Sequence, residues 1–203
     1  MAYKQPWQQL LVNFLAHTLF AQGNAERIAG QFCGDFVRGA DLSQYPEGIQ
    51  QGIRRHRRID AYTDQHPAVR ECLDVFDPPV RRFAGIITDV VFDYYLARDW
   101  ARYSDITIEQ HVDTVHDALN EKRDLLPPDL QRFAAFLQRE NVLLGNKRYS
   151  GVEITLDRLS RRSPKFAPLA QGAAIAAKFE AEISSAFDTF FPELLASERA
   201  RVE

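Results

Sequence analysis

Apolar side chains recur every three or four residues through most of the chain, and this period restricts the fold more than any other feature. Residues 6–20 show it in Trp7, Leu10, Phe14 and Leu15, which fall on one face of an α-helix. An alternating strand pattern never persists beyond a few residues. With 203 residues, 45% of them apolar, the chain can bury one core of ordinary size. The sequence therefore predicts a single compact all-α domain, a helical bundle, over residues 1–203.

Asparagine, glycine and proline mark the ends of the expected helices. Asn24 suits the N-cap of a helix that ends near Gly39. Pro46 suits the first turn of the next helix, and Pro67 begins a fourth. Further helices are expected at residues 80–100, 107–123, 151–163 and 168–190, of which the first is the most apolar.

Composition excludes several classes of protein. The net charge of −3 does not suggest bulk nucleic-acid binding, although a local basic patch is compatible with it. Cys33 and Cys72 form neither a disulfide framework nor a zinc spacing. The chain shows no signal peptide and no apolar run long enough for a membrane span. It also lacks the P-loop, GxGxxG, GxSxG and HExxH motifs. We expect a cytoplasmic protein.

The stretch RRHRRIDAYTD at residues 54–64 carries the densest set of functional groups. His56, Asp60 and Asp64 are four residues apart and share one helical face. Two carboxylates at this spacing repel each other, so arginines or a cation must offset the repulsion. A solvated charged face, a docking patch and a metal site all remain open for this stretch. Asp60 could pair with a nearby arginine, and Asp64 could cap the helix at Pro67.

Other polar residues occupy apolar helices. Asp89 and Asp93 repeat the four-residue spacing within the most apolar segment, where a carboxylate is costly unless it is paired or bound to metal. His17 and Asp35 lie on two further apolar helices. Such residues can converge on one ion in a helical bundle, and mixed His and carboxylate ligands suit Mn²⁺, Fe or Zn²⁺. The alternatives are that His17 is a satisfied core residue and that Asp35 pairs with Arg38.

Two further histidines, His111 and His116, have polar sequence neighbours. The sequence predicts a solvated helix face for both. Cys33 has no local base signature and is expected to be a small buried residue.

A family resemblance rests on four segments in a fixed order and spacing. They are residues 13–17 (NFLAH), 34–39 (GDFVRG), 52–64 (GIRRHRRIDAYTD) and 88–100 (TDVVFDYYLARDW). This series resembles the acyl carrier protein phosphodiesterase family, and the first twelve residues look like an extension of its first helix. The resemblance implies an all-α fold similar to HD-domain phosphohydrolases, although His56 is followed here by Arg57 rather than Asp. It also implies hydrolysis of holo-acyl carrier protein to apo-protein and 4′-phosphopantetheine with a divalent cation, typically Mn²⁺, or else Mg²⁺ or Fe²⁺.

The helix-face pattern and the resemblance together lead us to expect a role for each of the residues picked out above. The expected metal ligands are His17, Asp35, His56, Asp60 and Asp89. Asp64 and Asp93 are expected to bind the metal or to contact its ligands, and one of the two is expected to orient water or relay a proton. Arg57 or Arg58 is expected to bind a phosphate oxygen. The acidic carrier protein is expected to dock on Arg54, Arg55, Arg161 and Arg162. Two other functions stay open: a phosphohydrolase of nucleotides or other small phosphate esters, and a non-catalytic helical protein that binds an acidic partner.

Overall fold

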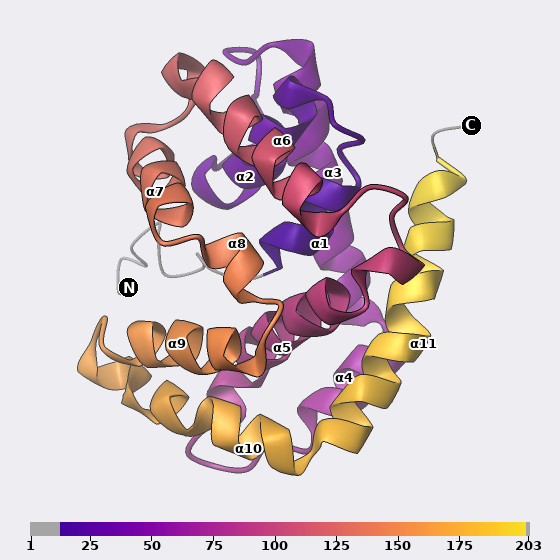
Figure 1. Cartoon of the computed structure of the whole chain (residues 1–203), viewed down its shortest axis with the longest axis vertical. Coiled ribbons are helices and arrows are strands. Elements are labelled where there is room, and N and C mark those ends of the chain that lie inside the picture. The colour runs from indigo at the N-terminus through magenta and orange to yellow at the C-terminus, as the bar shows by residue number, and fades with distance from the viewer. Residues whose placement is uncertain (1–12, 202–203) are drawn as a thin grey trace. The chain divides into compact units, whose positions relative to one another are not determined.

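The computed structural model describes residues 13–201. The regular secondary structure of these residues is helical (Figure 1). No strand occurs within this range, so the predicted all-α class is confirmed. Trp7 and Leu10, expected in the first helix, lie outside the described residues. By their contacts the described residues divide into two units. The first holds the residues up to Arg58 together with Asp99–Leu144, and the second holds Ile59–Arg98 and the residues from Gly145 onward.

The first unit is organised around α2. Its helices are α1 (Phe14–Leu19), α2 (Ala25–Phe36), the first part of α3 (Glu47–Gln65), α6 (Ile108–Glu121), α7 (Pro128–Arg139) and the start of α8 (Val142–Gly145). Helix α2 packs against α1, α6 and α7. The predicted cap of α2 is confirmed, because the Asn24 side chain accepts a hydrogen bond from the Arg27 N–H at 2.9 Å.

Helices α2 and α3 approach each other through glycines. A Cβ atom added to Gly30 would lie 2.3 Å from the Ile49 carbonyl oxygen, and one added to Gly52 would lie 2.5 Å from the Arg27 carbonyl oxygen. Only a residue without a side chain permits this backbone contact. Because the two helices touch here, residues further along both of them are brought together.

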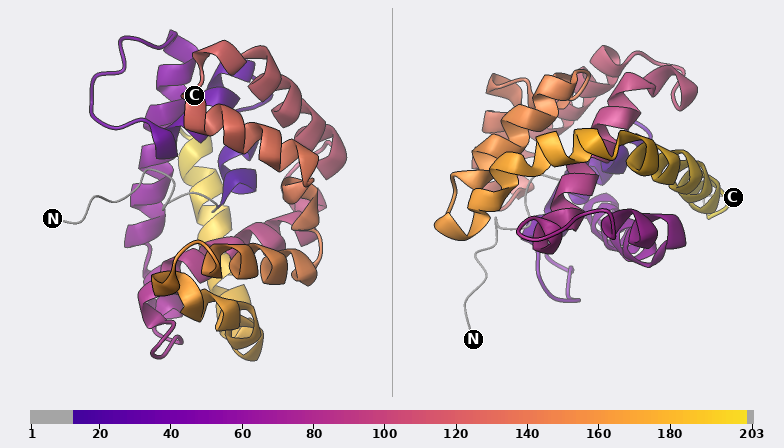
Figure 2. Two further views of the ribbon diagram at one scale, coloured as in Figure 1. Left: turned by 90° about the vertical axis from the view of Figure 1, so that its left-hand side faces the viewer. Right: turned by 90° about the horizontal axis from the view of Figure 1, so that it is seen from below.

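The second unit contains the later part of α3 together with α4 (Pro67–Leu73), α5 (Ala84–Arg98), α9 (Tyr149–Ser160), α10 (Gly172–Lys178) and α11 (Glu180–Arg199). Helix α5 buries most of its side chains, as its composition predicts. Its Phe92 ring packs on Phe187 and Phe190 of α11, at centroid distances of 5.3 and 5.8 Å. Helices α9 and α10 lie side by side (Figure 2).

The helix expected at residues 168–190 is interrupted. A 3₁₀ segment spans Pro164–Gln171, and α10 ends before Phe179, whose φ of −113° and ψ of 29° are not helical. Pro168 lies inside the 3₁₀ segment and lacks the N–H that the interior of an α-helix needs. Among residues 13–201, no helix combines the length and the hydropathy that crossing a lipid bilayer requires.

Candidate metal centre

Two buried histidines form the middle of the candidate centre. His17 lies on the last turn of α1 and is 1% exposed, and His56 of α3 is 2% exposed. Their rings stack with centroids 4.1 Å apart and planes inclined by 20°. The predicted convergence of these histidines from separate helices is therefore present in the first unit.

Helix α2 supplies the surface against which His56 lies. A Cβ atom at Gly34 would lie 2.2 Å from Cγ of the His56 ring, so that position accepts no side chain without displacing the ring. The next residue, Asp35, has its Oδ1 atom 3.4 Å from Nε2 of His56, and its side chain is only 14% exposed. Asp35 is thus placed beside His56, as the metal hypothesis expects.

Asp60 adds a second carboxylate one turn after His56 on the continuous helix α3. His17, His56 and Asp60 each offer a ligand atom, and these atoms all lie within 4.8 Å of one another. Ligands on opposite sides of one ion lie about 4 Å apart, because each bond to the metal is about 2.1 Å long. Imidazole and carboxylate donors suit divalent transition metals, so the residues present fit such an ion.

Asp64, one further turn along α3, is exposed. Partial desolvation raises the pKa of its carboxyl group, and the neighbouring Asp60 charge raises it further. His66, rather than Asp64, is the N-cap residue of α4.

The carboxylates of α5 belong to the second unit. Asp93 is 4% exposed, and its Oδ2 atom accepts a long hydrogen bond of 3.5 Å from Nδ2 of Asn146. Asp89 is half-buried. Asn146 is a polar contact that the sequence did not indicate. The participation of Asp89 and Asp93 in the candidate metal centre stays a prediction.

The arginines of residues 54–58 are engaged with backbone and side-chain groups. Arg57 donates to the carbonyl oxygens of Val37 and Gly39, both at 2.8 Å, and so fixes the chain that leaves α2. Arg55 donates to the Phe20 carbonyl oxygen.

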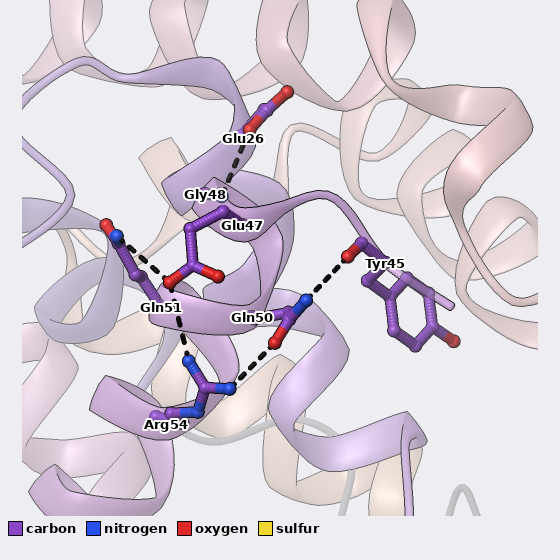
Figure 3. A network of polar contacts seen from close by, with 7 residues as sticks. All are labelled: Glu26, Tyr45, Glu47, Gly48, Gln50, Gln51 and Arg54. Atoms are coloured by element: carbon purple, nitrogen blue, oxygen red, sulfur yellow. Dashed lines mark hydrogen bonds and ion pairs between the residues drawn. The ribbon is translucent and has the colours of Figure 1, made fainter. Parts of the chain in front are cut away.

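Arg54, by contrast, contacts side chains: it lies 2.7 Å from Gln50 and 3.5 Å from Glu47 (Figure 3). Arg58 is half-buried. The partner-binding and phosphate-binding roles of these residues stay predictions.

The second arginine cluster follows α9. Arg161 is 77% exposed at its side chain and pairs with Asp157 at 2.9 Å. Arg162 is half-buried, and desolvation lowers the pKa of its guanidinium group. Of this pair, Arg161 is the more accessible to a partner.

His111 corrects the expectation of a solvated face. It is 5% exposed, its ring lies 4.8 Å from that of Trp100, and its Nε2 atom lies 2.9 Å from Thr18 Oγ1. The prediction was wrong because α6 packs against α2 and buries this position. Since the Thr18 hydroxyl donates to the Phe14 carbonyl oxygen at 2.9 Å, the His111 Nε2–H donates to Thr18. His111 thereby holds the residue that follows His17. His116, by contrast, is only half-buried.

Acid is expected to destabilise the fold through His111. Burial lowers its pKa from 6.5 to about 4, so the unfolded chain takes up a proton at a higher pH than the folded protein does. The free energy of unfolding should therefore be fully maintained above pH 6.5 and should fall by about 3 kcal/mol as the pH drops toward 4. Urea unfolding at several pH values checks this. His111→Gln should show a shallower decline over that interval, and identical profiles for the two proteins would exclude His111 as the cause.

Comparison with known proteins agrees with the resemblance described above. A family model described as acyl carrier protein phosphodiesterase matches residues 12–194. A protein of that name from Photorhabdus laumondii is 28% identical over 91% of this chain and 93% of its own length. Proteins of the same name from Enterobacter sp. (strain 638) and Serratia proteamaculans are 30% and 29% identical, over 91% of this chain and 96% of each relative. No solved structure is significantly similar. Because the family match spans nearly the whole chain, the protein belongs to the acyl carrier protein phosphodiesterase family.

Proposed function

We propose that this protein hydrolyses holo-acyl carrier protein to the apo-protein and 4′-phosphopantetheine. The observation that carries the proposal is the buried pair His17 and His56, flanked by Asp35 and Asp60, in a chain of this family. The relatives' shared name supports acyl carrier protein as the substrate. Both units are taken as one phosphodiesterase domain, which the extent of the family match supports.

His17, His56 and Asp60 would hold the divalent ion, with Asp35 as a further ligand or as the partner of His56. We propose Mn²⁺, since mixed imidazole and carboxylate donors suit it. A bound ion of this kind supplies Lewis-acid polarisation of the phosphoryl group and of the attacking water.

The protein's own residues keep the centre ordered. Asp35 orients the His56 imidazole, while the stacked His17 ring and the Gly34 backbone limit its rotation. Asp64 is the candidate on α3 for orienting the water or accepting a proton, because it follows Asp60 by one turn. Arg58 is the candidate for contact with a phosphate oxygen, since Arg57 already serves two carbonyl oxygens.

Exposed arginines are proposed to attract the acidic carrier protein. Arg54 and Arg161 have side chains 54% and 77% exposed, so both remain accessible despite their acidic neighbours. Arg55 and Arg162 are less accessible and would contribute mainly through their charge. A cytoplasmic setting is part of the proposal, and the two free cysteines, Cys33 and Cys72, support it.

Intact-mass spectrometry of holo-acyl carrier protein incubated with this protein and Mn²⁺ tests the function. We expect conversion to the apo-protein with release of 4′-phosphopantetheine, and no conversion after the metal is removed with EDTA. Hydrolysis of a nucleotide or another small phosphate ester, with holo-acyl carrier protein left intact, would favour the alternative phosphohydrolase. Binding of the carrier protein without hydrolysis or metal uptake would favour a non-catalytic binding protein.

A further inference from the structure

One buried side chain of the first unit lacks the contacts that its chemistry requires. Gln31 of α2 is 1% exposed, and neither its Oε1 nor its Nε2 atom has a hydrogen-bond partner among residues 13–201. Buried amides are nearly always hydrogen-bonded, because leaving one unpaired costs roughly 1–3 kcal/mol for each group. A leucine would occupy a similar volume without this cost. The unpaired amide is therefore a feature that packing alone does not explain.

The position of Gln31 on α2 connects it with the candidate metal centre. Residues 31, 34 and 35 have the i, i+3, i+4 spacing of one helical face. The other two members of this face are Gly34, which lies directly against the His56 ring, and Asp35, which lies 3.4 Å from His56 Nε2. Gln31 therefore lies one turn before Asp35 on the same face of α2.

We propose that Gln31 is a ligand-binding residue of this centre, whose Nε2–H group donates a hydrogen bond to an oxygen of the bound phosphate ester. This inference rests on the proposed function in taking a phosphate ester as the ligand. An amide suits the position because the centre already holds the carboxylates of Asp35 and Asp60. It adds a donor toward the phosphoryl oxygen without adding another negative charge. The cost of the unpaired amide is then recovered when the ligand binds.

Gln31→Leu separates this role from a structural one. With neither Mn²⁺ nor phosphate present, the variant should unfold at the same temperature as the wild type or at a higher one, because an unpaired buried amide is removed. Its affinity for inorganic phosphate in the presence of Mn²⁺, measured by isothermal titration calorimetry, should fall by about tenfold or more. The matched control is Gln131→Leu. Gln131 of α7 donates to the Leu126 carbonyl oxygen at 3.0 Å, so its loss should lower the unfolding temperature and leave phosphate affinity unchanged.

Gln31→Met repeats the test with a flexible side chain of similar length, in case leucine packs poorly. Loss of phosphate affinity in both folded variants supports the inference. Wild-type phosphate affinity in either folded variant overturns it, as does a wild-type protein that binds no phosphate. A failure of the proposed function can be distinguished from a failure of this inference. If the wild type binds phosphate but releases no 4′-phosphopantetheine, the proposed function is wrong, and the calorimetry still decides the role of Gln31.

Discussion

Replacement of His56 by alanine is expected to lower kcat/KM for 4′-phosphopantetheine release by about 10³-fold. Loss of a residue that merely orients a metal ligand typically costs 10–100-fold, and His56 is proposed as a ligand itself. The substitution removes the ring on which His17 stacks and the contact to Asp35. Mn²⁺ affinity, followed by calorimetry, should fall together with activity, because only Asp60 and the displaced His17 would remain of the three-residue cluster.

His116→Gln is the matched control for this variant. His116 is a half-buried histidine of α6 and is not part of the three-residue cluster. The control should retain both Mn²⁺ affinity and activity to within a few-fold. A His56→Ala protein that folds and keeps wild-type Mn²⁺ affinity would show that the ion binds elsewhere, and the centre would have to be reassigned.

Replacement of Gly34 by alanine is expected to lower activity by more than about 10²-fold without touching any ionisable group. The new Cβ atom would lie 2.2 Å from Cγ and 2.3 Å from Cδ2 of His56, far inside van der Waals contact. Either the ring moves away from Asp35 or α2 and α3 separate, and small displacements of this kind cost about 10²-fold in an enzyme. Overpacking should also lower the free energy of unfolding by about 1–3 kcal/mol.

Gly85→Ala provides the control, because nothing lies within 4 Å of the Cβ atom that it would add near the start of α5. That variant should be more stable than the wild type by up to about 1 kcal/mol, since alanine is the better helix former. Chemical denaturation and the carrier-protein assay measure both effects. If Gly34→Ala behaved like Gly85→Ala, the close contact between α2 and His56 would not be needed for activity.

Local sequence signals predicted most of the helices. The Asn24 cap and Pro67 at the first turn of α4 act within one or two turns of the chain, so each can be recognised from a few neighbouring residues. The break at Phe179 was not predicted, because the alanine-rich and aromatic residues on either side are both compatible with a helix. The helical period itself determined the all-α class.

The composition of the candidate centre was partly predictable, and its arrangement was not. Four-residue spacing along one helix places Asp60 beside His56, and this holds wherever that helix packs. The stacking of His17 on His56 depends on the packing of separate helices, and so do the burial of His111 and the unpaired amide of Gln31.

By itself, the sequence determined most of the helices, the family and the residue types that could bind a metal ion. Only the tertiary structure decided which of these side chains meet. The physical reason lies in the glycines of α2 and α3: Gly30 and Gly52 let the two backbones touch, and Gly34 accepts the His56 ring. Glycine has no side chain and adds nothing to the hydrophobic pattern of its helix. Its role in close helix packing is therefore recognised only once the tertiary structure shows which helix lies opposite.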